Sequence, residues 1–321
     1  MRRASILLAV VAVLACACGG TDTTTPASRE TPTTARDETV DAPNASPDVV
    51  GGTAQPADLV RSEITLIDPS RPTIARPPLA GSAQRSLRIS LRRPPGAGPW
   101  PLVVFGHGFG ARVDTYSALL DRIAIAGFVV AAPEFPGSSS ALAGKPDERD
   151  LDQEPCDLRF VADQLVRGNG NGQDGPIVST GPVALAGQSD GATAAAFAAE
   201  VAVACPAPAI GAVIAFSARP PPPGSPRSSG AGAVLLATTG TADEVNPPAQ
   251  TQALVTQWPD RAWLVTSDGD GHLAPATTSP RQVAIANLVV DVLRGSIGGD
   301  PSALDRLAAD AAVPGLHLQS R

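Results

Sequence analysis

The stretch Val183-Ala184-Leu185-Ala186-Gly187-Gln188-Ser189-Asp190-Gly191 decides how this sequence folds. Its four leading apolar residues predict a buried strand, and the alanine-rich run that follows it, to about Ala204, predicts a helix. Between the two lies Gly-x-Ser-x-Gly, the pattern of a tight strand-to-helix turn that exposes a serine hydroxyl. Because the chain has 31 glycines, the pattern alone could arise by chance as a plain turn. Its place between a buried strand and a small-residue helix supports the catalytic interpretation.

Strand and helix patterns alternate on both sides of this turn. Besides 183–186, short apolar segments predict strands at 64–67, 87–91, 102–105, 128–132, 212–216, 234–237 and 263–265. Apolar residues at helical spacing predict helices over 113–123, 155–165 and 283–293, and Asp300-Pro301 opens a last short one. This alternation predicts an α/β fold, a mostly parallel eight-stranded sheet with helices on both faces.

The N-terminus has the pattern of an export signal. Arg2 and Arg3 precede the apolar run Ile6 to Cys18, which is shorter than the roughly 20 residues of a membrane-spanning helix. Val13-Leu14-Ala15-Cys16 resembles a bacterial lipobox, which predicts a signal over 1–15 and lipid attachment at Cys16. Ordinary cleavage after Ala17 stays open. The protein is therefore expected in the cell envelope as a lipoprotein, or otherwise secreted.

Composition divides the rest of the chain and excludes one class of partner. Residues 16–58 form a Thr/Pro/Ser-rich tether without apolar periodicity, 59–313 the catalytic domain and 314–321 a tail. With 24 basic and 31 acidic residues the net charge is −7, which argues against nucleic-acid binding. Membrane contact is expected only through the lipid anchor. The oligomeric state is not indicated.

A serine hydroxyl needs a base to take its proton, and the sequence offers three histidines. His107 lies in a Gly-His-Gly turn before the serine, and His317 lies beyond the last predicted helix. His272 follows the last predicted strand, in a glycine-containing loop. In this class of fold the chain order is serine, acid, histidine, so His272 is the predicted base.

The acid that orients the base is predicted at Asp243, which follows the strand over 234–237. Glu244 is its nearest competitor. Asp268 and Asp270 are too close to His272 in sequence to be the usual partner, although Asp270 could assist.

The loop Gly106-His107-Gly108-Phe109-Gly110 supplies the donor for an oxyanion. The backbone N–H groups of Phe109 and Asp190 are the predicted pair, and His107 is expected to be a hydrogen-bonding turn residue. The carboxylate of Asp190 would oppose the developing negative charge if it pointed inward. We expect it to point toward the first turn of the following helix.

These motifs together resemble the α/β-hydrolase superfamily over roughly residues 60 to 295. The segment Asp68-Pro69-Ser70-Arg71-Pro72-Thr73 is similar to chlorophyllase-like and platelet-activating-factor acetylhydrolase-like esterases. Gly108-Phe109-Gly110-Ala111-Arg112 and Gly127-Phe128-Val129-Val130 are similar to bacterial cutinase-like polyester hydrolases. Those relatives more often carry His or Trp where this chain has Gln188 and an apolar residue or Gly where it has Asp190, which leaves the substrate open.

The resemblance implies cleavage of carboxylic esters, small or polymeric, through an acyl-enzyme, without cofactor or metal. A peptidase or amidase with the same triad and a non-catalytic surface-anchored binding protein on this fold are the alternatives. Many members carry a helical lid, but the connection 217–231 contains Pro220-Pro221-Pro222-Pro223, so no lid helix is expected.

The pairing of Cys156 and Cys205 has two opposing arguments. Exported proteins with two cysteines usually pair them. Against this, Cys156 begins one predicted helix and Cys205 ends another, and parallel helices would place them at opposite edges of the sheet. Both alternatives stay open.

Overall fold

The computed structural model of the protein describes residues 55–168, 177–201, 204–222, 224–225 and 232–321. The predicted export signal, Cys16 and the tether up to residue 54 lie outside the described residues. None of the helices in the described ranges has the length and apolarity needed to cross a membrane.

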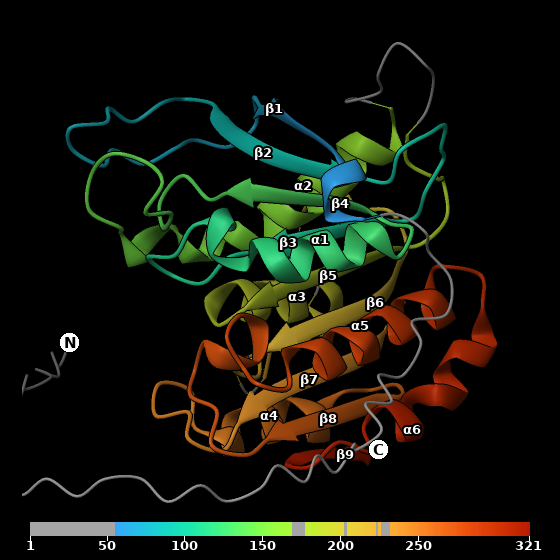
Figure 1. Ribbon diagram of the computed structural model, residues 1–321. Coiled ribbons are helices and arrows are strands. Elements are labelled where there is room, and N and C mark those ends of the chain that lie inside the picture. Colours follow the sequence, from blue (N-terminus) through green and yellow to red (C-terminus); the bar gives the residue numbers. More distant parts are fainter. Residues whose placement is uncertain (1–54, 169–176, 202–203, 223, 226–231) are drawn as a thin grey trace, which may run out of the picture. The chain divides into compact units, whose positions relative to one another are not determined.

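A single nine-stranded sheet runs through the domain in the order β1-β2-β4-β3-β5-β6-β7-β8-β9 (Figure 1). The six strands from β4 to β8 in this order are parallel, whereas β1, β2 and β9 are antiparallel to their neighbours. The strands are β1 Val60–Asp68, β2 Arg85–Arg93, β3 Leu102–Gly106, β4 Val129–Glu134, β5 Val183–Gln188, β6 Ile210–Phe216, β7 Val234–Gly240, β8 Ala262–Ser267 and β9 Leu316–Ser320. This is the α/β-hydrolase fold that the sequence predicts.

The sheet has one strand more than the eight predicted. Part of the segment expected to be a tail forms β9, which pairs antiparallel with β8 from Leu316 to Ser320. Leu316 is buried whereas the next residue, His317, is exposed. Five residues of alternation carry little signal by themselves, and pairing with the edge of β8 supplies the stabilisation that the local sequence lacks.

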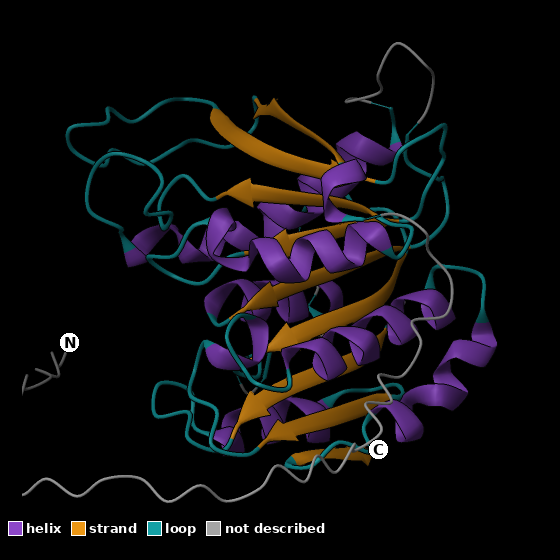
Figure 2. Ribbon diagram, in the orientation of Figure 1, coloured by secondary structure: helices purple, strands orange, loops and turns teal. Residues whose placement is uncertain are grey.

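Helices cover both faces of the sheet (Figure 2). The α-helices are α1 Ser117–Ile125, α2 Glu154–Val166, α3 Asp190–Glu200, α4 Pro248–Gln257, α5 Gln282–Ser296 and α6 Leu307–Asp310. The short 3-10 helices are η1 Pro56–Asp58, η2 Val113–Tyr116, η3 Glu148–Gln153, η4 Ala274–Ala276 and η5 Pro301–Arg306. Helices α2, α3 and α4 pack into one apolar core, and α1, α5 and α6 pack into the other.

Two helical expectations need correction. The sequence did not predict α4, because this helix buries only Thr251, Leu254 and Val255 and therefore shows little apolar periodicity. Helix α3 ends at Glu200 rather than near Ala204. The described residues of the connection from β6 to β7 include no helix, which agrees with the expectation that no helical lid covers the site.

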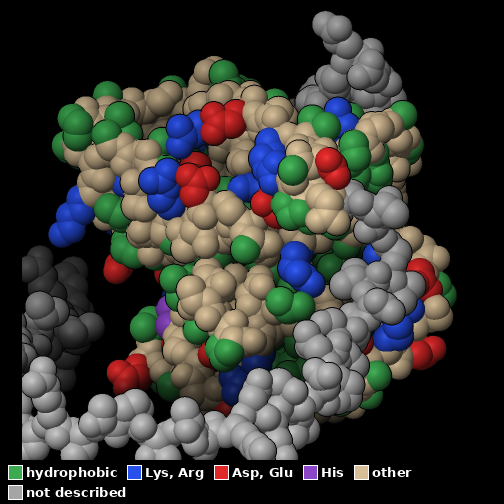
Figure 3. All heavy atoms as spheres, viewed as in Figure 1, with side chains coloured by type: hydrophobic (Ala, Val, Ile, Leu, Met, Phe, Trp, Pro, Cys, Tyr) green, Lys and Arg blue, Asp and Glu red, His purple; other side chains and the backbone are tan. Residues whose placement is uncertain are grey.

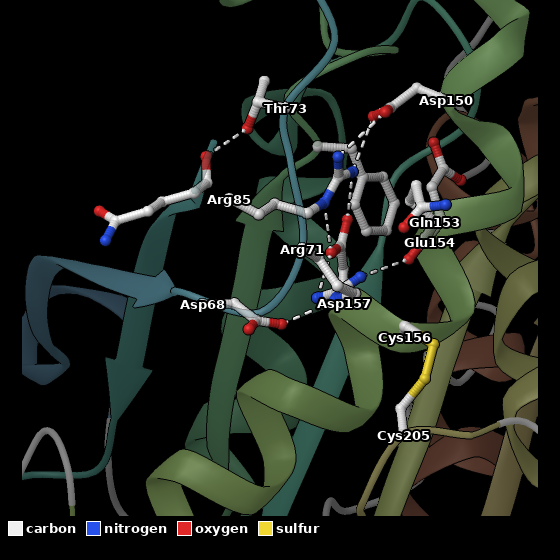
Figure 4. A network of polar contacts seen from close by, with 12 residues as sticks. Asp68, Arg71, Thr73, Arg85, Asp150, Gln153, Glu154, Cys156, Asp157 and Cys205 are labelled. Atoms are coloured by element: carbon white, nitrogen blue, oxygen red, sulfur yellow. Dashed lines mark hydrogen bonds and ion pairs between the residues drawn. A yellow bond between two sulfur atoms is a disulfide. The ribbon is translucent and has the colours of Figure 1, made fainter. Parts of the chain in front are cut away.

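Cys156 and Cys205 form a disulfide with their Cα atoms 5.6 Å apart (Figure 4). The argument that helix ends hold these cysteines apart is therefore wrong. Cys205 lies beyond the end of α3, in the segment that leads to β6, and this segment lies against the beginning of α2. Arg159, one turn after Cys156 on α2, donates to the carbonyl oxygens of Ala198 and Cys205, both at 2.7 Å.

Charged side chains of both signs are interspersed on the face seen in Figure 3. Asp121 of α1 pairs with Arg61 of β1 and with Arg92 of β2, both at 3.0 Å. These two ion pairs join α1 to β1 and β2.

Candidate active site

Ser189, Asp243 and His272 lie together at the carboxyl ends of three parallel strands. Ser189 follows β5, Asp243 lies shortly after β7, and His272 lies in the loop after β8. His272 Nε2 is 2.8 Å from Ser189 Oγ, and His272 Nδ1 is 2.9 Å from Asp243 Oδ2. The three predicted residues therefore form one continuous hydrogen-bonded chain.

The backbone around Ser189 explains the glycines of the motif. Ser189 has a φ of +56°, a region that costs a non-glycine residue about 1–3 kcal/mol. Its N–H donates to the Phe216 carbonyl oxygen at 2.8 Å. A Cβ at Gly187 would lie 2.4 Å from the carbonyl carbon of Gly191, and one at Gly191 would lie 2.3 Å from the Gly106 oxygen. Only glycine permits these close approaches of neighbouring backbone.

The surroundings of Asp243 determine which nitrogen of His272 carries the proton. Asp243 is buried, and its Oδ1 accepts the N–H groups of Val245 at 3.0 Å and of Asn246 at 2.9 Å. An ionised carboxylate only accepts hydrogen bonds, so it favours the tautomer with the proton on Nδ1. His272 Nε2 is then left as an acceptor for the Ser189 hydroxyl. This is the arrangement needed for general-base catalysis.

The competing acids have other partners. Asp268 Oδ2 lies 3.0 Å from Nε2 of His317, a residue of β9, so both residues pair with each other outside the site. Asp270 is buried and accepts the Ser267 hydroxyl at 2.5 Å, which places it in the support of the loop rather than against the imidazole. Glu244 is exposed, and among the described residues the carboxylate bonded to His272 is that of Asp243.

The loop after β3 lies against the serine, since a Cβ at Gly108 would be 3.2 Å from Ser189 Cβ. Neither the N–H of Phe109 nor that of Asp190 has a hydrogen-bond acceptor within the described part of the chain. The next N–H, that of Gly110, donates to the Ser138 carbonyl oxygen at 2.9 Å and holds the loop. Unpaired N–H groups at such a turn are able to stabilise an oxyanion.

His107 is a buried, neutral turn residue. Its Nδ1 lies 2.8 Å from the Gly108 carbonyl oxygen, and its Nε2 accepts the Phe135 N–H at 3.0 Å. Burial lowers the pKa of His107, although the nearby Glu134 opposes the shift. With both ring nitrogens occupied, His107 has no free position for proton transfer at Ser189.

The carboxylate of Asp190 forms an ion pair with Arg219, a residue that the sequence did not single out. Arg219 lies in the segment after β6, and its backbone N–H donates to Thr193 Oγ1 on the first turn of α3 at 3.1 Å. The Asp190 charge is thus held on the α3 side and neutralised. Asp190 and Arg219 are 29 residues apart in sequence and meet only because the fold brings the segment after β6 to α3. The local sequence around either residue therefore does not predict the ion pair.

A buried ionic network supports the segment that holds the oxyanion loop (Figure 4). Arg85 is fully buried and donates to both oxygens of Asp150 and both oxygens of Asp157, at 2.6 to 2.9 Å. Burial alone would lower the pKa of Arg85, but the two carboxylates raise it overall. Arg76 donates to the carbonyl oxygens of Pro136, Ser139, Leu142 and Gly144. Arg76 thus ties the loop between β1 and β2 to the segment that contains Ser138, whereas Arg85 ties the start of β2 to η3 and α2.

With this geometry established, one comparison with known proteins bears on the activity. Residues 82–160 match the family model of platelet-activating factor acetylhydrolase, isoform II. This confirms the resemblance to esterases of that type and indicates a hydrolase that acts on esters. The match includes β2, β3, β4 and the loop of Phe109 but ends before Ser189. It therefore does not cover Ser189, Asp243 or His272. No curated protein matches the sequence.

Proposed function

We propose that the protein is an exported serine esterase that cleaves carboxylic esters with Ser189, His272 and Asp243. The observation that carries the proposal is the hydrogen-bonded chain from Asp243 through His272 to Ser189 Oγ. The family match over residues 82–160 supports an ester as the substrate. His272 is half-buried and Phe109 is exposed, so solvent and substrate reach the site.

The reaction follows from the positions of these groups. Ser189 Oγ attacks the ester carbonyl carbon while His272 Nε2 takes its proton, and Asp243 stabilises the imidazolium that forms. The N–H groups of Phe109 and Asp190 donate to the oxyanion of the tetrahedral intermediate. The intermediate collapses to an acyl-serine, and His272 returns the proton to the leaving alcohol. A water molecule, activated by His272 in the same way, then releases the acid and restores the serine.

The proposal is tested by labelling the purified protein with a fluorophosphonate while assaying p-nitrophenyl esters of increasing acyl length. We expect Ser189→Ala to abolish labelling and to lower kcat by roughly 10⁴-fold or more, since it removes the nucleophile. Ser302→Ala, which changes an exposed serine of η5, is the matched control and should behave as wild type. A folded wild-type protein that neither labels nor turns over esters would refute the proposal and favour a binding protein. Faster cleavage of anilide analogues than of esters would favour an amidase.

We further propose that export places the protein in the cell envelope with a lipid on Cys16. The support is the apolar run before Cys16 and the lipobox-like Val13-Leu14-Ala15-Cys16. Expression with labelled palmitate in a bacterial host should label the wild type and Cys18→Ser, but not Cys16→Ser. An unlabelled product that begins after Ala17 would instead show ordinary signal cleavage.

A further inference from the structure

The carbonyl oxygen of His272 accepts hydrogen bonds from two buried side chains. Gln188 Nε2 donates to it at 3.1 Å and Ser217 Oγ donates at 3.0 Å. Gln188 ends β5 and Ser217 follows β6, so neither belongs to the loop that carries the histidine. We propose that Gln188 and Ser217 are positioning residues that hold the imidazole of His272 against Ser189 Oγ. This inference rests on the proposed function.

The loop of His272 needs such support. Gly269 and Gly271 precede the histidine, and glycine permits many backbone conformations. In the described part of the chain, the hydrogen bonds to the peptide groups of His272 itself come from these two side chains. The Nδ1 bond to Asp243 orients the ring, whereas the bonds to the carbonyl oxygen locate the backbone from which the ring extends. Both are needed to place Nε2 at hydrogen-bonding distance from the serine.

Ser217 also joins the base to the loop of the acid. Its carbonyl oxygen accepts Asn246 Nδ2 at 2.7 Å, and the backbone N–H of Asn246 donates to Asp243 Oδ1. Among the described residues, Ser189 and Ser217 are the non-glycine residues with positive φ, and Ser217 has +52°. Glycine would adopt this conformation more easily, but it would lack the hydroxyl that reaches His272. The hydrogen bond from the Ser217 hydroxyl to the His272 carbonyl oxygen therefore explains why a serine, rather than a glycine, occupies this unfavourable backbone conformation.

The orientation of the Gln188 amide is set from its other end. Gln188 Oε1 accepts the Tyr116 hydroxyl at 2.9 Å, and the Tyr116 oxygen accepts the Gly108 N–H at 3.2 Å. Burial raises the pKa of Tyr116 to about 12, so the hydroxyl stays protonated and donates. This leaves Gln188 Nε2 to face His272. A Cβ at Gly108 would lie 2.6 Å from Gln188 Oε1, so glycine makes room for the amide.

Ser217→Gly separates positioning from a merely structural role. The substitution eases the backbone and removes the hydroxyl, so we expect Tm to stay at or above that of the wild type. We also expect kcat per active site, titrated with fluorophosphonate, to fall about tenfold, because a slightly misplaced base loses productive geometry. KM should stay within about twofold. A Ser217→Gly protein with unchanged kcat per active site would overturn the role of Ser217.

Gln188→Met tests the second donor with a side chain of similar length. We expect a ten- to hundredfold lower kcat per active site, and a further loss when it is combined with Ser217→Gly, since both donors serve one oxygen. Thr238→Val is the matched control, because Thr238 Oγ1 is buried without a hydrogen-bond partner among the described residues. The control should retain the wild-type kcat.

A measurement that does not depend on turnover completes the test. The proton between His272 Nδ1 and Asp243 should give a downfield proton resonance in NMR, identified by its loss in His272→Gln. We expect this resonance to shift or broaden in Gln188→Met and Ser217→Gly but not in Thr238→Val. If the wild type hydrolyses no ester, the proposed function fails while the resonance still reports on the positioning. An unchanged resonance in both variants would overturn the positioning alone.

Discussion

Removal of the disulfide between Cys156 and Cys205 would show how strongly the link between α2 and the segment after α3 stabilises the domain. The two cysteines are 49 residues apart in sequence, and the loop they close contains β5, Ser189 and α3. For a loop of this length the lost chain entropy of the unfolded state corresponds to about 4 kcal/mol at 25 °C. Both cysteines are only partly buried, so replacing them with serine should add little packing loss.

The assay compares urea unfolding of the wild type with that of Cys156→Ser/Cys205→Ser, both in a Cys16→Ser/Cys18→Ser background. With an m-value of about 2.5 kcal/mol per M, we expect the midpoint to fall by about 1.5 M. Denatured protein of the same background should expose no thiol before reduction and two after it. Two thiols without reductant, or a change in the free energy of unfolding below about 1 kcal/mol, would refute the reasoning.

Two further predictions concern the buried charges. Burial, reinforced by nearby aspartates, raises the pKa of Glu154 well above its usual value, so the wild type loses stability as pH rises above about 4.5, where only the unfolded chain ionises. In urea unfolding, the free energy of unfolding of Glu154→Gln should therefore rise relative to that of the wild type between pH 4 and pH 8. A difference between the two free energies that does not change with pH would contradict this. Arg85→Met removes the cation that Asp150 and Asp157 share and leaves Asp157 with Arg71 alone, so it should lower the free energy of unfolding by about 3–5 kcal/mol. Arg149→Met, which breaks an exposed pair, is the control and should leave it nearly unchanged; equal effects of the two would count against a structural role for the buried network.

Local patterns in the sequence were sufficient for most of the fold. The strands over 102–105, 128–132 and 234–237 are short apolar runs bounded by turn residues, and their type follows from neighbouring residues alone. Elements with weak patterns were missed: α4 has few buried side chains, and β9 is five residues long. Both are formed because the rest of the sheet presents a surface for them.

Ser189, Asp243 and His272 could be predicted to lie close together because the topology of the sheet places the ends of their strands side by side. Each follows a parallel strand of one sheet, and the carboxyl ends of such strands meet at the same edge. The serine, acid and histidine order then selects one histidine from three. The competing Asp270 was excluded by sequence distance, and the structure shows it supporting the loop through Ser267.

The sequence by itself determined the α/β class, the turn at Ser189 and the order of the residues around it, because these depend on apolar periodicity and on glycines next to one another in the chain. Only the tertiary structure decided that Cys156 meets Cys205, that Asp190 pairs with Arg219 and that Gln188 and Ser217 share the carbonyl of His272. These contacts join residues far apart in sequence, through side-chain atoms whose meeting depends on how loops pack after the sheet has formed. Contacts of this kind cannot be predicted from the residues that neighbour each partner in the sequence.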